Sequence, residues 1–315
     1  MVDHRAQIFV ARLIFMGVEI KDEAVVVVDP YSSGPLLVDE LHHRGFPVVA
    51  VRTSLNLSEA VLETWNSVSF ERVIVHRGDV MKTLAALQRE GRVKAVIAGS
   101  EYGVELADEL ANAMGLRGNA MELSACRRDK YKMQERLREC GLRSCIQRCC
   151  ISTLDASDFA REVVSWPLIV KPCVSTGIEH IYKCETEAAL AEAVLAVLGS
   201  KDSKGSRREA ALVQVFLEGT EFLVDCVSFD GRHFVSAIWE HQKKHSAGFF
   251  ACDRIAAVPY CDQMESDQAK IRDYVFSCLT ALGVKNGPSQ CKVMFSQTTG
   301  PCLIEAGGRV HSSIG

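Results

Sequence analysis

The chain has 315 residues, with 36 lysines and arginines against 40 aspartates and glutamates, so its formal net charge is −4. This mild acidity supplies no basic field for nucleic acid, and we expect no nucleic-acid partner. Hydrophobic residues make up 48% and charged residues 24%, which excludes a disordered chain and fits a globular protein of about two domains.

No apolar run approaches the roughly 20 residues that span a bilayer, so we expect no membrane partner. The apolar stretch 8–18 is interrupted by Arg12 and lacks the small-residue cleavage site of a signal peptide. The 13 cysteines are scattered, and the densest stretch, 140–150, has neither paired spacing nor a nearby histidine for structural zinc. An odd number of cysteines without a secretory signal favours free thiols in a reducing compartment, which predicts a cytoplasmic protein.

The first 120 residues alternate strands and helices in the way that is typical of a doubly wound sheet, and we expect a Rossmann-like domain over residues 1–120. Four consecutive valines lie between turn-forming residues in the segment Glu23–Pro30, the pattern of a parallel strand buried on both faces. The motif DPYSSG (29–34) follows, without the GxGxxG spacing of a dinucleotide site. Further strands are predicted at 47–51, 73–76 and 93–98, with helices up to Gly45, at 81–89 and at 104–114.

The character of the sequence changes near Gly118. A strongly charged helix is predicted at 127–139, and the short apolar strand PLIVKP (167–172) carries a lysine near its end. The dipeptide Asp230-Gly231 signals a tight hairpin between the strands 222–228 and 233–239. Further helices are predicted at 186–198 and 268–282, a further strand at 211–216, and a last hairpin at 290–296 and 301–306.

The register of the last hairpin places two opposite charges together. If Ser296 faces Pro301, then Lys292 directly faces Glu305 on the neighbouring strand. Directly opposed side chains share one face of a sheet, about 5 Å apart at Cβ. We therefore expect Lys292 and Glu305 to lie side by side.

Five segments, in this order, resemble the ATP-grasp superfamily, and most of all its stand-alone carboxylate–amine ligases, which include amino-acid ligases. The resemblance implies a Rossmann-like pre-ATP-grasp domain over residues 1–120 and an ATP-grasp domain over 121–315, with ATP clamped between antiparallel sheets. The ATP-grasp domain would divide into a first subdomain, 121–210, and a second, 211–315, and would lack part of the usual C-terminal extension. The segments are VVVVDPYSSG (25–34), ELSACRRDKYKMQERLRECGL (122–142), PLIVKP (167–172), LVQVFLEGTEF (212–222) and LIEAGGR (303–309).

The triphosphate of ATP carries about four negative charges and needs fixed cations around it. Lys130 and Lys171 match the phosphate-binding lysines of the family. Each has the alternative interpretation of a solvated surface lysine. That alternative fits Lys171 less well, because an apolar strand would bury its amine without a partner.

The resemblance also implies the rest of the nucleotide site. Gln214 and Leu217 match the positions that receive adenine, and Glu221 matches the carboxylate that binds the ribose hydroxyls. The loop that contains Ser175, Thr176 and Gly177 matches the flexible phosphate lid, whose backbone N–H groups meet the phosphates. A second glycine is common three residues later, where this chain has His180. The alternatives are a solvated strand for the polar residues and an ordinary turn for the loop.

In such ligases a carboxylate attacks the γ-phosphate of ATP, and an amine then displaces phosphate from the acyl phosphate. Arg309 matches the catalytic arginine that steadies the charged oxygens through this step, a task that suits the planar fork of a guanidinium. Glu101 and Glu105 could contact an amine substrate, although a carboxylate at the start of a helix is the simpler interpretation.

The family usually binds Mg²⁺ through one acidic residue on each strand of the last hairpin and a nearby asparagine. Glu305 fills the second acidic position and is the predicted metal ligand, whereas Lys292 stands at the first and Gly307 replaces the asparagine. A lysine about 4 Å from Mg²⁺ would be repelled by roughly 8 kcal/mol at an effective dielectric constant of 20. Either Lys292 turns away and Glu305 holds one Mg²⁺, or the ammonium pairs with Glu305 and replaces the ion.

The leading hypothesis is an ATP-dependent ligase that joins a small-molecule carboxylate to an amine, with amino acids among the candidate substrates. The alternative is a catalytically impaired ATP-binding paralogue with a scaffold or regulatory role, motivated by Lys292, His180 and the end of the chain at Gly315. Carboxylation is less favoured, because nothing in the sequence indicates biotin or bicarbonate. The identity of the substrates and the oligomeric state stay open, although members of the family are often dimeric.

Overall fold

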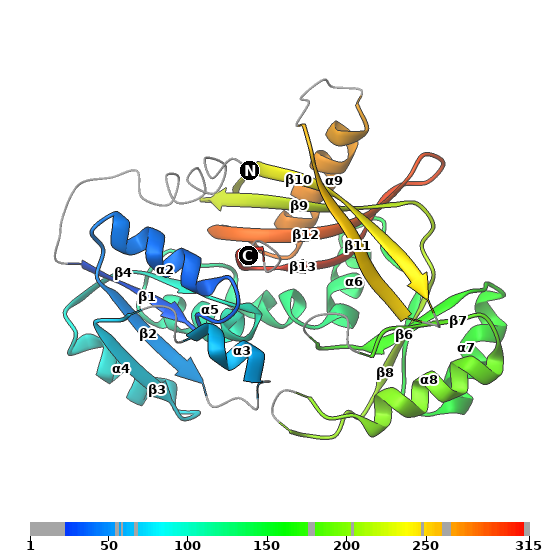
Figure 1. Ribbon diagram of the computed structural model, residues 1–315, viewed down its shortest axis with the longest axis horizontal. Helices are drawn as coiled ribbons and strands as arrows, with labels where there is room; N and C mark the ends of the chain where they lie inside the picture. The colour runs from blue at the N-terminus through cyan, green and yellow to red at the C-terminus, as the bar shows by residue number, and fades with distance from the viewer. Residues whose placement is uncertain are drawn as a thin grey trace.

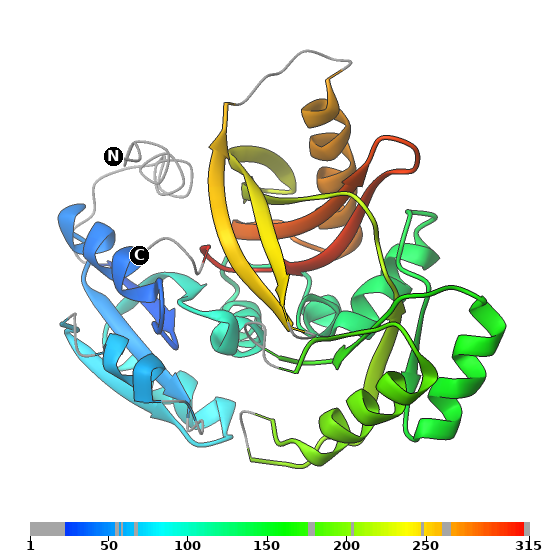
Figure 2. The same cartoon turned by 45° about the vertical axis from the view of Figure 1, so that its right-hand side comes forward.

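The computed structural model describes residues 23–53, 57, 59–65, 69–175, 180–202, 205–246, 249–259 and 266–311. The apolar stretch 8–18 and the lid residues Thr176 and Gly177 lie outside the described residues. Three sheets organise the described chain, and in both views the N-terminal and second sheets flank the space below the third (Figures 1 and 2). Across these residues, no helix combines the length and the apolar character needed to cross a membrane.

The N-terminal sheet is parallel, as predicted, with the strand order β3-β2-β1-β4. All six residues of the central strand β1 are buried, because helices cover both faces of a parallel sheet and leave no face for polar side chains. The elements are β1 (Glu23–Val28), α2 (Gly34–His43), β2 (Val48–Thr53), α3 (Glu59–Thr64), β3 (Arg72–His76), α4 (Val80–Gln88), β4 (Arg92–Ala98), η2 (Glu101–Gly103) and α5 (Val104–Ala113).

The second sheet is antiparallel, with the order β5-β8-β6-β7. One face packs on α7 and α8 through a core that includes Leu168, Val170 and Val213. The predicted subdomain boundary between residues 210 and 211 is wrong in one respect, because β8 pairs with β5 and β6 and extends this sheet to Val215. The elements are β5 (Gln147–Cys150), α7 (Thr153–Val163), β6 (Leu168–Pro172), β7 (Tyr182–Cys184), α8 (Glu187–Gly199) and β8 (Ala211–Val215).

The third sheet has five antiparallel strands in the order β11-β10-β9-β12-β13. Side chains alternate along each strand, and one set packs against α9 and α6 to form the core around Val224, Cys291 and Leu303. The predicted hairpin around Asp230-Gly231 is confirmed, and both residues have the positive φ that a tight turn requires (47° and 80°). The elements are β9 (Thr220–Phe229), β10 (Arg232–Ser246), β11 (Phe249–Val258), α9 (Asp267–Ala281), β12 (Gly287–Ser296) and β13 (Gly300–Gly307).

The predicted helix 127–139 is shorter than expected. A 3₁₀-helix, η3, covers Met121–Arg127, and the α-helix α6 spans Lys130–Glu139. The break follows from Asp129, whose carboxylate accepts the backbone N–H groups of Tyr131 (2.8 Å) and Lys132 (3.1 Å) and caps the helix. Lys130 thereby becomes the first residue of α6.

A buried ion pair joins the end of η3 to the N-terminal sheet. The Arg127 guanidinium is 1% exposed and lies 2.6 Å from the Asp108 carboxylate on α5. The same guanidinium donates to the carbonyl oxygens of Leu282 (2.6 Å) and Ala120 (2.9 Å). This ion pair ties α5 to the segments that lead into α6 and follow α9.

Candidate functional site

The second face of the third sheet carries charged side chains instead of apolar ones. Glu221 and Asp225 on β9 point to the side away from α9, because residues at even spacing share a face. Lys292 on β12 pairs with Leu223 of β9 and with Glu305 of β13, so all three belong to this face. The predicted pairing of Lys292 with Glu305 is confirmed.

The part of the hairpin between this pair and the loop departs from the predicted register, whereas Gln290 and Cys291 keep it. A β-bulge follows Lys292, so that Ser296 pairs with Gly300 and Phe295 with Pro301. The loop between the strands is therefore shorter than expected. The extra residue of β13 lies at the bulge, where it has no partner on β12. The shift begins just beyond the Lys292–Glu305 pair, which explains why that pairing survives.

Two ammonium groups share the Glu305 carboxylate. The Lys292 Nζ lies 2.6 Å from Oε1, and the Lys130 Nζ lies 3.3 Å from Oε2. Burial alone would raise the pKa of the Glu305 carboxyl, but Lys292 and Lys130 hold that pKa well below its usual range. Burial would lower the pKa of Lys292, and the carboxylates of Glu305 and Glu221 raise it instead. Both partners are therefore ionised.

Lys171 points into the same region from β6 in the second sheet. Its side chain is buried (4% exposed), and among the described residues no hydrogen-bond or ion-pair partner contacts its ammonium. Burial lowers the pKa of Lys171 to about 8, and the positive charges of Lys130 and Lys292 add to this effect. The two predicted phosphate-binding lysines thus converge on one region, and Lys171 brings a buried, unpaired positive charge to it.

Arg309 lies beside this group and is held by residues from two parts of the chain. Its Nε donates to Glu101 (2.8 Å), and its Nη1 donates to the Gln290 side chain (2.7 Å). Arg128 donates to the other oxygen of Glu101 at 2.6 Å. Burial would raise the pKa of the Glu101 carboxyl, but Arg309 and Arg128 lower it. Glu101 therefore orients both guanidinium groups as an ionised carboxylate.

Gly307 provides the room that Glu101 occupies. A Cβ atom at position 307 would lie 2.7 Å from the Glu101 Oε2, closer than real side chains approach. Gly307 stands where the resemblance places an asparagine, so the departure has a structural reason in this chain. The space of that side chain is filled by a carboxylate from the N-terminal half.

The site as a whole carries an excess of positive charge. Its five cations and three carboxylates leave a net charge of about +2 when all are ionised. An oligophosphate or an acyl phosphate is the kind of ligand that such a set attracts. The eight residues are Glu101, Arg128, Lys130, Lys171, Glu221, Lys292, Glu305 and Arg309.

Gln214, Leu217 and Glu221 lie where the chain passes from β8 of the second sheet to β9 of the third. The Gln214 amide donates to the Gln147 side chain at 2.8 Å, which places it on the α6 side of β8. Glu221 is buried (5% exposed) and lies 2.6 Å from Nδ1 of His241. The predicted adenine and ribose residues thus lie along the connection that joins the two antiparallel sheets.

The beginning of the predicted lid contacts the first phosphate-binding lysine. The Lys130 Nζ lies 3.3 Å from both the carbonyl oxygen and the hydroxyl of Ser175. His180, on the far side of the loop, has a φ of +58°, a backbone conformation that favours glycine. The position where the resemblance expects glycine therefore has the backbone geometry of glycine, at the expense of strain in histidine.

Two charged residues near the site, Asp225 and Arg128, were not predicted as part of it. Asp225 accepts the Trp239 indole N–H at 2.7 Å and lies 3.1 Å from Nδ1 of the buried His311. Arg128 was missed as well, because it lies in a run of charges that gives no periodic signal. Because alternate residues of a strand share a face, the spacing of four residues between Glu221 and Asp225 could have indicated that Asp225 belongs to the same face.

The predicted metal site does not fit a divalent cation as its residues stand. Both oxygens of Glu305 are bound by ammonium groups, from Lys292 and Lys130. Within the described part of the chain, no three or more histidine, cysteine, aspartate or glutamate side chains are grouped to hold a metal ion. The metal role of Glu305 remains a prediction, and the observed pairing corresponds to the second of the two arrangements considered for Lys292.

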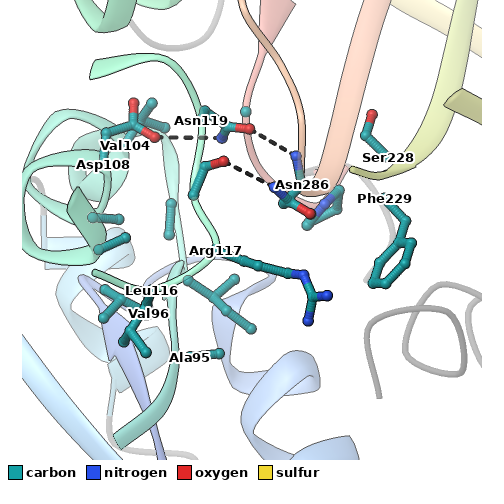
Figure 3. Close-up of a pocket in the computed structure, with 18 of the residues that line it drawn as sticks. Ala95, Val96, Val104, Asp108, Leu116, Arg117, Asn119, Ser228, Phe229 and Asn286 are labelled. Carbon is teal, nitrogen blue, oxygen red and sulfur yellow. Dashed lines mark hydrogen bonds between the residues drawn. The ribbon is translucent and has the colours of Figure 1, made fainter. Parts of the chain in front are cut away.

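A separate cavity of about 340 Å³ lies between β4, α5 and the start of β12 (Figure 3). Asn119 crosses it, donating to Asp108 (3.3 Å) and accepting the backbone N–H of Asn286 (3.0 Å). The Asn286 amide donates to the Gly118 carbonyl oxygen at 2.9 Å. None of the eight charged residues lines this cavity, which lies where the N-terminal sheet meets the third sheet.

Comparison with known proteins yields one family. A profile of the ATP-grasp domain matches residues 164–314. Dapdiamide A synthase of Enterobacter agglomerans is 31% identical over 291 residues, which cover 91% of this chain and 67% of that protein. Alanine–anticapsin ligase of Bacillus subtilis strain 168 is 26% identical over 232 residues, which cover 68% of this chain and 48% of that protein.

Solved structures show the same fold at low sequence identity. The L-amino acid ligase of Bacillus licheniformis superposes with a TM-score of 0.73 at 20% identity, covering 93% of this chain and 68% of that one. The N5-carboxyaminoimidazole synthase of Aspergillus clavatus, solved with ADP and a ribonucleotide, gives a TM-score of 0.70 at 14% identity, covering 93% of this chain and 72% of that one.

Proposed function

Since the chain belongs to the ATP-grasp family, we propose that it is an ATP-dependent ligase that joins a small carboxylate to an amine. The carboxylate oxygen attacks the γ-phosphorus of ATP, the bond to the β,γ-bridging oxygen breaks, and ADP leaves. The amine nitrogen then attacks the acyl carbon and loses a proton, phosphate leaves with the bonding electron pair, and an amide remains. The names alanine–anticapsin ligase and L-amino acid ligase favour amino acids as substrates.

The observation that carries the proposal is the convergence of lysines from three elements on one region. Lys130 at the start of α6, Lys171 on β6 and Lys292 on β12 lie around one carboxylate, Glu305. Gathering three ammonium groups in a partly buried region is electrostatically unfavourable unless an anion joins them. A bound triphosphate would supply the anionic partner that the Lys171 ammonium lacks among the described residues.

We assign roles to the predicted residues on this basis. Lys130 and Lys171 bind phosphate oxygens, and the loop that begins with Ser175 closes over them. Glu221 accepts hydrogen bonds from the ribose, while Gln214 and the backbone at Leu217 border the adenine. Thr176 and Gly177 stay predicted lid residues.

Arg309 is the candidate catalytic residue. Three of its five N–H groups donate to Glu101, Gln290 and the Val310 carbonyl oxygen, so the two on Nη2 are left for a ligand. Those donors suit the oxygens of an acyl phosphate, whose charge changes as phosphate leaves. We assign no step to a divalent cation, because ammonium groups bind both oxygens of Glu305.

A second candidate function is an ATP-binding protein with little or no turnover. The Lys292–Glu305 ion pair favours it, since it occupies the carboxylate that the resemblance gives to Mg²⁺. Nucleotide binding alone does not separate the two candidates. Turnover does.

The test is ADP formation by the purified full chain with ATP, Mg²⁺ and pairs drawn from a panel of amino acids and amines. The ligase proposal predicts ADP release with at least one pair, above the rate without an acceptor, and an amide of matching mass. Lys171→Met, which removes the ammonium and keeps an unbranched side chain of similar length, is the control and should abolish the signal. ATP binding without ADP release from any pair would favour the second candidate and overturn the first.

A further inference from the structure

Two thiols lie in contact on the second sheet, close to the proposed nucleotide site. The Sγ of Cys149 on β5 and the Sγ of Cys173, one residue beyond β6, are 3.1 Å apart. Both residues are partly exposed, whereas most of the eleven described cysteines are buried. Both belong to the scattered cysteines predicted to be free thiols, and nothing in the proposed ligation uses them.

The register of the sheet places this thiol pair on the face that carries Lys171. Cys149 pairs with Leu212 on β8, and Leu212 pairs with Lys171 on β6. Paired residues share a face, so Cys149 and Lys171 are on the same side, opposite the core under α7 and α8.

The backbone of Cys173 is part of the wall of the site. Its carbonyl oxygen accepts the backbone N–H of Lys130 at 2.9 Å. Ser175, which contacts the Lys130 ammonium, follows two residues later. Movement of Cys173 would therefore move the start of the phosphate loop.

The two sulfur atoms have unequal acidities. The contact with the Cys173 sulfur lowers the pKa of Cys149 more than its burial raises it. The same contact and burial raise the pKa of Cys173. Cys149 is thus the better nucleophile, and Cys173 is its neighbour.

We propose that Cys149 and Cys173 form a redox-active pair, which a low-molecular-weight disulfide oxidises to an intramolecular disulfide that anchors the start of the phosphate loop to β5. The Cys149 thiolate attacks one sulfur of oxidised glutathione, forms a mixed disulfide and releases one glutathione thiolate. The Cys173 thiolate then attacks Sγ of Cys149 and releases the second glutathione. The two cysteine sulfurs are oxidised, the glutathione disulfide is reduced to two thiols, and these carry away the two protons.

The disulfide changes the position of the loop. The sulfurs must approach by about 1 Å to reach the covalent S–S distance of about 2.05 Å. Because Cys173 binds Lys130 through its backbone, we expect the affinity for ATP to fall by threefold or more on oxidation and to recover after reduction. A displacement of about 1 Å at a phosphate contact is enough to have such an effect.

The test uses the full chain incubated with oxidised glutathione, blocked with iodoacetamide and mapped by peptide mass spectrometry. The expected result is a peptide pair linked through Cys149 and Cys173, and a loss of about two titratable thiols. Cys173→Ser should retain glutathione on Cys149 as a mixed disulfide, whereas Cys149→Ser lacks the attacking thiol and should retain little. Cys140→Ser, at an exposed cysteine elsewhere, is the matched control and should form the link as the parent does.

Recovery of Cys149 and Cys173 as separately alkylated residues after oxidation would overturn the proposal. So would a disulfide that joins either of them to another cysteine. Neither readout requires turnover, so failure of the ligase proposal would leave this result intact. The ATP affinity of the oxidised chain, measured with and without dithiothreitol, tests the effect on the loop separately.

Discussion

Replacing Lys292 by glutamate tests whether its ammonium stands in the place of a metal ion. At 2.6 Å and an effective dielectric constant of 20, the attraction between Lys292 and Glu305 is about 6 kcal/mol before desolvation is counted. Lys292→Glu replaces it by a repulsion of roughly 3 kcal/mol between carboxylates about 5 Å apart on neighbouring strands. Without metal, we therefore expect Lys292→Glu to lower the melting temperature.

The same variant presents two opposed carboxylates to a divalent cation. Mg²⁺ at about ten times its dissociation constant would stabilise the folded variant by about 1.4 kcal/mol. That energy raises the melting temperature by roughly 2–4 °C. Thermal unfolding of the parent, Lys292→Glu and the neutral control Lys292→Met, each titrated with Mg²⁺ without nucleotide, measures the effect.

We expect Mg²⁺ to shift the melting temperature of Lys292→Glu and to leave the parent and Lys292→Met almost unchanged. An equal shift in the parent would refute the reasoning, because Glu305 would then bind metal despite its two ammonium partners. Parallel ADP assays separate a lost metal site from a recruited lysine. Higher turnover in Lys292→Glu indicates the former, and lower turnover the latter.

Three further predictions concern the charges and the close contacts around the site. Since burial lowers the pKa of Lys171 to about 8 and ATP favours its protonated form, ATP binding should take up protons at pH 8 and weaken from pH 7 to 9. Calorimetry in buffers of different ionisation enthalpy measures both, and pH-independent binding without proton uptake would contradict the assignment. Asp108→Asn should lower the free energy of unfolding by about 3–5 kcal/mol by leaving Arg127 buried and unpaired, whereas Asp230→Asn, at the exposed pair with Arg117, should change it by less than about 1 kcal/mol. Urea unfolding compares the two, and equal effects would contradict a structural role of the buried pair. Gly307→Ala should reduce turnover by tenfold or more, because its Cβ would displace the Glu101 carboxylate by roughly 1 Å and with it Arg309, while Gly308→Ala meets only ordinary contacts and should behave as the parent.

Local pattern was enough to predict much of the architecture. The valines of β1 predicted a buried parallel strand, because only a strand covered on both faces tolerates such a run. The pairing of Lys292 with Glu305 followed from counting residues across one short loop. The β-bulge after Lys292 did not, since a bulge depends on main-chain hydrogen bonds that no side-chain pattern reports.

Long-range pairing limited the rest of the prediction. The subdomain boundary was predicted just before β8, because the mostly apolar residues 211–215 fit any buried strand, and only the topology assigns β8 to the second sheet. Arg128 and Asp225 could not be recognised from the sequence, because their partners, Glu101 and His311, lie far along the chain. The glycine at position 307 is explained by the Glu101 carboxylate, which lies where a Cβ atom at that position would be.

The central claim is that Lys130 and Lys171, from different elements, bind one triphosphate. Titration calorimetry of ATP with the full chain and with Lys171→Met tests it most directly, with thermal unfolding confirming that the variant folds. Loss of a charge-assisted contact of about 1.5–3 kcal/mol predicts that ATP binds the variant more than tenfold more weakly. Equal ATP affinity in the parent and in a folded Lys171→Met would contradict the account.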